Sequence, residues 1–306
     1  MGDYRDYRDH GSGGGRHRQA GRRRLRSLLL AGIPVFFVVA VVAARLSLAG
    51  GSAPKRTAGS PRAAGHQTGA PAAHSQGPAG SSQPAALPLA GKIVGIDPGH
   101  NGLNFSEPSA LARQVWNGRS EENCDTTGTQ TAGGYTEALF NFDVAMYLRA
   151  DLIRDGARVA MTRYSNNGFG PCVDKRAEIL NAAGADVSID IHGDGGPVSG
   201  RGFTVLEPVA DGPNDKVIAA SDAFGADVHA AMLALTPFGV SDYYGVDGYI
   251  QRDDLAGLNL TTEPKVLIEC GNMTNPADAA LMVRPLVQRE IARALEAAIV
   301  KFLTGG

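Results

Sequence analysis

A short apolar run that stops at a turn constrains this chain most. Ile93, Val94 and Ile96 have the composition of a strand that is buried on both faces. The run stops at Asp97-Pro98-Gly99, which are turn-forming residues, and His100 follows directly. In open α/β sheets, ligands bind beside the carboxyl ends of the strands. The sequence therefore predicts a sheet whose rim holds an imidazole at a fixed place, and His100 is a candidate metal ligand.

In the rest of the chain, segments whose apolar residues are spaced as in helices alternate with segments whose apolar residues are spaced as in strands. Thr136 is placed to cap a helix that runs from Glu137 to Asp155, and Gly156 ends it. The later apolar segments predict strands at 158–162, 186–191, 202–206 and 265–269 and helices at 173–183, 216–233, 276–282 and 286–302. This alternation predicts an α/β fold: a single domain with a mixed, mostly parallel central sheet flanked by helices.

In two long segments of this domain, the apolar residues show neither helical nor strand periodicity. Residues 101–135 form a loop of 35 residues that holds Trp116, the only tryptophan. A loop of this length inside a compact domain usually has a function. It has room for a short hairpin, and our hypothesis is that it partly covers a cleft at the sheet rim and regulates access to it. Residues 237–264 are also expected to be irregular.

The first 90 residues have the composition of a delivery segment. Residues 1–27 are polar and rich in arginine, residues 28–49 are mainly apolar, and residues 50–90 are rich in Ala, Gly, Pro and Ser. A positive stretch before an apolar one is typical of a signal peptide or of an uncleaved transmembrane anchor. The uncharged part is short for a membrane span, whereas Ser47 and Ala49 fit a cleavage signal. Both interpretations stay open. A buried core helix is the third alternative, and the polar low-complexity sequence on both sides of the segment argues against it.

Either interpretation places residues 91–306 outside the cytoplasm, as a folded domain behind a disordered linker. The formal net charge of the whole chain is −2, and its Lys and Arg residues are concentrated near the N-terminus. The folded part is net acidic, which argues against a nucleic acid bound through its phosphates. We expect a monomer, and its contact with a membrane depends on whether segment 28–49 is retained.

The chain has three cysteines, and in an exported protein a pair of them is expected to be oxidised. Cys124 lies in a loop rich in Gly and Thr, and Cys172 lies in another loop just before a predicted helix. Cys270 directly follows a predicted strand and is expected to be a buried free thiol. We favour a Cys124–Cys172 disulfide, although the sequence alone leaves the other two pairings open.

Three histidines lie outside the first 90 residues, and two of them occupy the same kind of place. His192 follows the strand that ends in 189–191, as His100 follows its own strand, and each stands beside a glycine turn. Either histidine alone could be a loop residue that bonds to the backbone. The coincidence of the two favours metal ligation. His229 lies in the middle of a predicted helix, and we expect it to be structural.

Two imidazoles, a carboxylate and an open position make a catalytic zinc site. Glu137 begins the first predicted helix and could be the carboxylate ligand, or it could serve only as a favourable acid at the helix start. Glu269 ends a strand and could be the general base for a zinc-bound water, or a salt-bridged strand end. Asp97 and Asp190 could orient the imidazoles, or they could cap turns.

In the order His100, Glu137, His192, Glu269, these side chains resemble the catalytic set of the zinc-dependent N-acetylmuramoyl-L-alanine amidases of the amidase-3 type. The resemblance covers about Gly91 to Leu303. The matching motifs besides Glu137 are IDPGHNG (96–102), RAEILN (176–181), ADVSIDIH (185–192) and IECGNMTN (268–275). The features shared with the mycobacterial-type amidases that lack a wall-binding module are NGR (117–119), the two loop cysteines, GRGF (200–203) and RDDLAGLN (252–259).

The resemblance implies that His100, Glu137 and His192 bind one Zn²⁺ and that Glu269 is the catalytic carboxylate. It also implies the substrate, which is the amide between the lactyl group of N-acetylmuramic acid and L-alanine of the stem peptide, in peptidoglycan or muropeptides. The fold that it implies has a central sheet of about six strands flanked by helices. Gly193-Asp194 and Cys270 depart from the family pattern, but neither removes a ligand.

Two other functions remain open on the sequence. A zinc peptidase or deacetylase that acts on the cell wall could use the same ligand set. A catalytically inactive wall-binding protein or division scaffold is the non-enzymatic alternative, and the intact set of His and Glu side chains argues against it.

Overall fold

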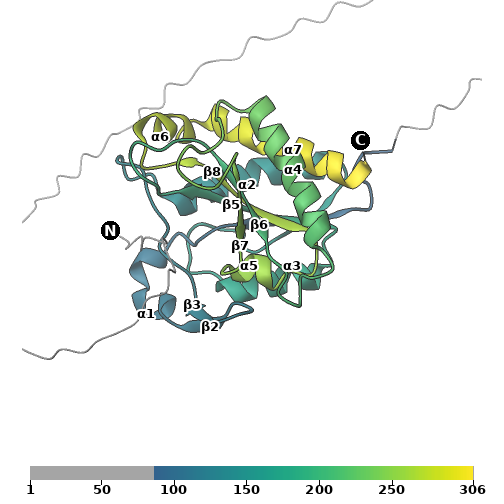
Figure 1. The fold of residues 1–306 in the computed structure, drawn as a ribbon, viewed down its shortest axis with the longest axis horizontal. Coiled ribbons are helices and arrows are strands. Elements are labelled where there is room, and N and C mark those ends of the chain that lie inside the picture. Colours follow the sequence, from purple (N-terminus) through teal and green to yellow (C-terminus); the bar gives the residue numbers. More distant parts are fainter. Residues whose placement is uncertain (1–85, 306) are drawn as a thin grey trace, which may run out of the picture. The chain divides into compact units, whose positions relative to one another are not determined.

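The computed structural model describes residues 86–305, and all structural statements below refer to them (Figure 1). The basic segment 1–27, the predicted signal or anchor 28–49 and most of the predicted linker lie outside the described residues. Among the described residues, the first fully buried side chain is that of Leu89. The N–H of Leu89 donates to the carbonyl of Asp155 at 2.9 Å.

The centre of the domain is a mixed sheet of six strands in the order β4-β1-β5-β8-β6-β7. Strands β4, β1, β5 and β8 are parallel, β6 runs antiparallel to β8, and β7 is parallel to β6. The bounds are β1 (Ile93–Pro98), β4 (Arg158–Met161), β5 (Val187–Asp194), β6 (Thr204–Pro208), β7 (Tyr249–Arg252) and β8 (Lys265–Asn272). The mixed, mostly parallel sheet that we predicted is confirmed.

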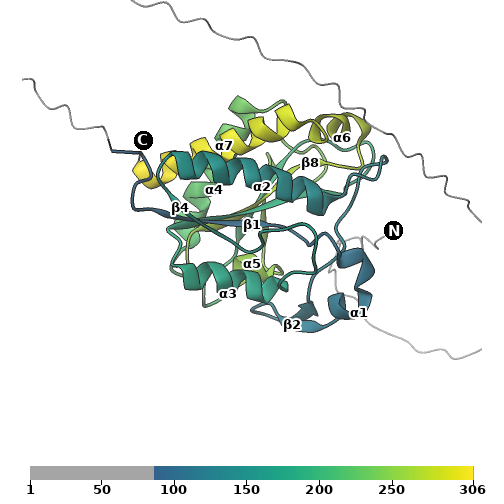
Figure 2. The same ribbon diagram turned by 180° about the vertical axis from the view of Figure 1, so that it is seen from behind.

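Helices cover both faces of the sheet (Figures 1 and 2). One face carries α2 (Glu137–Arg154), α4 (Ile218–Leu235) and α7 (Pro285–Thr304), with α6 (Pro276–Met282) beside α7. The other face carries α3 (Val173–Ala183) and α5 (Ala256–Asn259). As predicted, Thr136 caps α2, because its side chain accepts a hydrogen bond from the N–H of Leu139.

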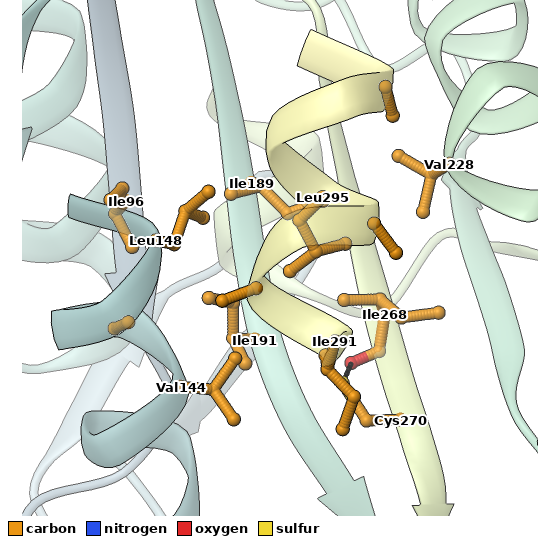
Figure 3. Packing of buried hydrophobic residues seen from close by; sticks show 14 of the residues in the cluster. Ile96, Val144, Leu148, Ile189, Ile191, Val228, Ile268, Cys270, Ile291 and Leu295 are labelled. Carbon is orange, nitrogen blue, oxygen red and sulfur yellow. Dashed lines mark hydrogen bonds between the residues drawn. The ribbon is translucent and has the colours of Figure 1, made fainter. Parts of the chain in front are cut away.

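The side chains of the central strands alternate between these two faces, as the period of two requires. Towards α2 and α7 the strands present Ile96, Ile189, Ile191 and Ile268, all fully buried in the main core (Figure 3). We call this side the apolar face. Towards α3 and α5 they present the ionisable residues Asp97, Asp190, His192, Lys265 and Glu269. We call that side the polar face.

Strands β5 and β8 continue further than the sequence predicted. The expected ends were residues 191 and 269, but β5 runs to Asp194 and β8 to Asn272. His192 therefore lies inside a strand, directly opposite Glu269 of β8. Gly193 was read as part of a turn. It is instead a residue of the strand, beside a shift of register between His192 and Asp194.

The two segments without a clear period contain short elements. Within 101–135 lie η1 (Asn104–Ser106), α1 (Pro108–Leu111) and a hairpin of β2 (Gln114–Trp116) and β3 (Glu121–Asn123). Residues 237–264, expected to be irregular, contain β7 and α5. Each of these two elements has only four residues, which is too short to show a period in the sequence.

The structure confirms the disulfide between Cys124 and Cys172, and Cys270 is a buried free thiol. Within the described part of the chain, only α4 is long and apolar enough to cross a membrane by length and composition. It packs against α7 and β6. Its residues Phe224, Val228 and Met232 are fully buried, so one face of α4 belongs to the core.

Candidate metal centre

His100 leaves the end of β1 in an uncommon backbone conformation. Its φ is 57°, a left-handed value that non-glycine residues seldom adopt and that often marks a functional site. The surrounding backbone is firmly held. The N–H of Gly99 donates to the carbonyl of Ile191 at 3.0 Å, and Nη2 of Arg176 donates to the carbonyl of His100 at 2.7 Å.

Gly99 is required here because it leaves space for the second imidazole. A Cβ atom at this position would overlap the ring of His192. Without that atom, the rings of His100 and His192 approach edge to face, with centroids 4.9 Å apart and an interplanar angle of 82°. The turn residues that the sequence analysis singled out thus also let the ends of two strands converge.

Glu137, the first residue of α2, completes the cluster. Its Oε1 lies 2.8 Å from Nδ1 of His192 and 3.1 Å from Nε2 of His100. Its Oε2 accepts a hydrogen bond from the N–H of Thr129 at 2.9 Å. One nitrogen or oxygen atom of each of these three predicted ligands lies within 4.8 Å of the others. The three side chains come from β1, α2 and β5, which the sheet and the helix start bring together.

The electrostatics of the cluster favour a cation. Burial by itself would lower the pKa of His100, but the charges and hydrogen bonds of Glu137 and Asp125 outweigh it and raise that pKa well above its ordinary value. Burial would raise the pKa of Glu137, but the imidazoles of His100 and His192 outweigh it and hold that pKa well below its ordinary value. A carboxylate stabilised in this way beside two imidazoles can exchange bound protons for a metal ion.

The donor set also fits zinc in type and spacing. Two imidazole nitrogens and one carboxylate oxygen are a known ligand set for catalytic zinc, with the fourth position open. Tetrahedral zinc, with bonds of about 2.0–2.1 Å to nitrogen and oxygen, places its ligand atoms about 3.3 Å apart. The separations of 2.8 and 3.1 Å from Glu137 to the two histidines need only a small outward movement.

Glu269 stands beside this cluster on the polar face, as the strand neighbour of His192. Its Oε2 is buried and makes no hydrogen bond to the described residues. Burial, together with the carboxylates of Asp194 and Glu137, raises the pKa of Glu269 well above its ordinary value. A buried carboxylate whose oxygen has no partner is suited to accept a proton from a water molecule at the cluster.

Asp97 and Asp190 do not take the orienting role that the sequence left open for them. Asp97 binds Thr162 and Arg176, each at 2.6 Å. Oδ1 of Asp190 lies 3.8 Å from Nε2 of His192, which is too long for a hydrogen bond. Both carboxylates instead flank Lys265, so they belong to a charge network under the cluster.

Sequence reasoning missed the partner of His100. Oδ1 of Asp125 lies 3.0 Å from Nδ1 of His100. The one signal for Asp125 in the sequence was that it directly follows Cys124, which we predicted to form a disulfide. His229, expected to be structural, lies apart from the cluster: its Nε2 is 3.0 Å from the carbonyl of Asp247, and its ring stacks on Tyr249.

A cavity of about 350 Å³ opens on the polar face next to both histidines. Glu122 and Asn123 of the β2–β3 hairpin line it, together with Leu255 and Gly257. The tip of the hairpin is fixed as well. Nε of Arg119 lies 3.1 Å from a carboxylate oxygen of Asp211, and the side chain of Asn259 donates to the carbonyl of Asn117 at 2.9 Å. The long loop is thus part of the wall around the candidate site.

Comparison with known proteins identifies the family of the chain. Residues 94–301 match the family described as N-acetylmuramoyl-L-alanine amidase. The chain is 41% identical over 216 residues to the N-acetylmuramoyl-L-alanine amidase Rv3717 of Mycobacterium tuberculosis, an alignment that covers 70% of this chain and 88% of that protein.

The chain also resembles the crystal structure of the N-acetylmuramyl-L-alanine amidase Ami1 of Mycobacterium smegmatis. Here the TM-score is 0.67 and the identity 40%, over 71% of this chain and 99% of the other. Ami1 of Mycobacterium abscessus in its apo form gives a TM-score of 0.64 at 40% identity, over 70% of this chain and all of the other. The family match spans more than half of the chain, and the chain therefore belongs to the N-acetylmuramoyl-L-alanine amidase family.

Proposed function

We propose that this protein hydrolyses the amide between the lactyl group of N-acetylmuramic acid and L-alanine of the stem peptide, in peptidoglycan or its muropeptides. In this proposal His100, Glu137 and His192 hold one zinc ion and Glu269 is the general base. The observation that carries the proposal is the convergence of these three donors beside a buried carboxylate oxygen of Glu269, which has no hydrogen-bond partner among residues 86–305. The family match and the names of the relatives support the choice of substrate.

Zinc, when bound, supplies Lewis-acid chemistry, since it makes a water molecule more acidic and polarises an amide carbonyl. The side chains of this protein move the proton. Glu269 would be ionised when the neighbouring ligands hold a cation, because a nearby positive charge lowers the pKa of a carboxyl group. Glu269 then takes a proton from the attacking water and later gives it to the nitrogen of the departing alanine.

The remaining expectations concern the location and the partners of the enzyme. Because its substrate is part of the cell wall, the catalytic domain acts outside the cytoplasm. Segment 28–49 delivers it there, either as a cleaved signal or as an anchor behind the linker. We expect a monomer that does not bind nucleic acid, and we expect the β2–β3 hairpin to limit access to the site.

The test compares the full-length wild type with Glu269→Gln and His192→Ala, by zinc analysis and by release of L-alanyl peptide from muramyl dipeptide. Glu269→Gln should keep zinc and lose about 10²- to 10⁴-fold in turnover, which is the usual contribution of a positioned acid or base. His192→Ala should lose zinc as well. His229→Ala is the matched control, because this histidine lies outside the cluster, and it should keep both.

Each alternative has its own outcome. Full activity of zinc-loaded Glu269→Gln would refute the base assignment. Release of acetate in place of a new alanine amino terminus would identify a deacetylase. Zinc binding by the wild type without turnover of any muropeptide would favour the inactive scaffold.

A further inference from the structure

We propose that Asp125 is a positioning residue of the metal centre: its carboxylate fixes the orientation and the proton of His100, and the Cys124–Cys172 disulfide holds that carboxylate in place. This inference rests on the proposed function, in which His100 is a zinc ligand.

The two nitrogens of His100 face different partners. Nδ1 lies 3.0 Å from Oδ1 of Asp125, and Thr126 Oγ1 is more distant at 3.5 Å. Nε2 points the other way, 3.1 Å from Oε1 of Glu137. A carboxylate acceptor at Nδ1 keeps the proton of a neutral imidazole on that nitrogen. The lone pair of Nε2 is then directed at the position that Glu137 and His192 share.

Asp125 is itself held by contacts to both of its oxygens. The residue is only 5% exposed. Its Oδ1 also accepts the N–H of Thr126 at 2.7 Å. Its Oδ2 accepts the side-chain amide of Asn101 at 3.0 Å and lies 3.6 Å from Nη2 of Arg176. Because neither oxygen can turn away without losing a partner, the acceptor for His100 has one orientation.

The loop that carries Asp125 needs a fixed point, since β3 ends at Asn123, two residues before it. The disulfide provides one, because it joins the neighbouring Cys124 to Cys172, the residue that precedes α3. Next to this bond, the N–H of Val173 donates to the carbonyl of Cys124 at 2.9 Å. Helix α3 also carries Arg176, which binds the carbonyl of His100. The disulfide thus joins the loop that orients the ring of His100 to the helix that holds its backbone.

His100 is the ligand that most needs such support. His192 lies within β5, where its backbone pairs with Glu269 of β8 and the preceding Ile191 pairs with Pro98 of β1. Glu137 is fixed by α2 and by the N–H of Thr129. His100 has left its strand and has a left-handed backbone, so its ring orientation depends on side-chain contacts.

The experiment measures the zinc dissociation constant of the full-length protein by competition with a chromophoric zinc chelator. Asp125→Ala should weaken zinc binding by about 10- to 100-fold, as loss of a partner behind a metal ligand usually does. Asp125→Asn keeps the volume and one acceptor oxygen, so its effect should be intermediate. Asp278→Ala is the matched control, because Asp278 is also buried and accepts the N–H of Gly202 at 2.8 Å. It should bind zinc like the wild type.

A double-mutant cycle tests the role of the disulfide. Cys124→Ala/Cys172→Ala should weaken zinc binding when Asp125 is present and should have no further effect in the Asp125→Ala protein. An equal disulfide effect in both backgrounds would overturn that half of the proposal. Folded Asp125→Ala and Asp125→Asn proteins that bind zinc like the wild type would overturn the whole of it. A wild type that binds no zinc would instead refute the proposed function.

Discussion

The two faces of the central sheet bury side chains of opposite kinds on the same strands. On the apolar face, Ile96, Ile189 and Ile268 are fully buried, next to the side chains of α2 and α7 (Figure 3). On the polar face, Asp97 is 2% exposed and Lys265 is fully buried. Neighbouring positions along one strand therefore meet an apolar core on one side and a charge network on the other.

The polar face is held by specific pairs. Nζ of Lys265 lies 3.5 Å from a carboxylate oxygen of Asp97 and 3.5 Å from one of Asp190. Nη1 of Arg176 lies 2.6 Å from the other oxygen of Asp97. Apolar packing is non-directional and tolerates changes that conserve volume, whereas a buried charge that loses its partner is strongly destabilising. The stability of the polar face, which carries the candidate metal centre, therefore depends on every charged partner being present.

Replacing Lys265 with Met tests the charged side of this comparison and has the largest expected effect on stability. Met roughly preserves the volume of the stem but removes the charge that Asp97 and Asp190 share. Removing one partner of a buried ion pair destabilises a protein by about 3–5 kcal/mol. We expect the free energy of unfolding, measured in urea on the metal-free protein, to fall by that amount.

Lys92→Met is the matched control. Nζ of Lys92 lies 3.7 Å from Asp186, and the side chains of this pair are 39% and 36% exposed. Such exposed pairs contribute about 0–1 kcal/mol. If the two substitutions lowered the free energy of unfolding equally, the contrast between the buried network and the surface would be wrong.

Acid should lower the free energy of unfolding, because it protonates Asp97 on the polar face. Burial by itself would raise the pKa of Asp97, but the charges of Arg176 and Lys265 outweigh it and hold that pKa well below its ordinary value of 3.8. The folded state then binds the proton less readily than the unfolded state does. The contribution of Asp97 to stability is therefore complete above about pH 4 and is lost as the pH falls below it. We expect a decrease approaching about 1.4 kcal/mol per pH unit from this one group.

Urea unfolding of metal-free wild type and Asp97→Asn between pH 7 and pH 2 measures this contribution. The variant should be less stable at neutral pH but should show a shallower decrease below pH 4. The range from pH 6 to 7 is an internal control, because both curves should run parallel there. If the free energy of unfolding of the variant fell with pH below pH 4 as steeply as that of the wild type, Asp97 would not be the cause of the acid sensitivity.

Much of this fold could be predicted because apolar periodicity reports burial. The predicted bounds of the helices at 173–183 and 276–282 agree with α3 and α6. Two strand ends beside glycines also pointed to His100 and His192. By contrast, the contact of Asp125 with His100 joins residues 25 positions apart and depends on how a loop folds back, which leaves no period in the sequence. The sharing of Lys265 by Asp97 and Asp190 depends on strand order, and local sequence does not encode that order.

Ile189→Val tests the apolar side of the comparison and has the smallest expected effect. Ile189 is fully buried in β5, one residue before Asp190. Loss of one methylene group from such a core typically lowers the free energy of unfolding by about 0.5–1.5 kcal/mol. We expect a decrease in this range in urea, because the neighbouring side chains can close part of the gap.

The same substitution at Ile153 is the control, because this residue is 45% exposed on α2, and changes at such positions usually stay within about 0.5 kcal/mol. The comparison requires a definite order, in which Ile189→Val destabilises more than Ile153→Val and less than Lys265→Met. If Ile189→Val matched Lys265→Met, packing on the apolar face would be as specific as pairing on the polar face. The metal centre would then depend on both faces alike, because β5 carries Ile189 on one side and His192 on the other.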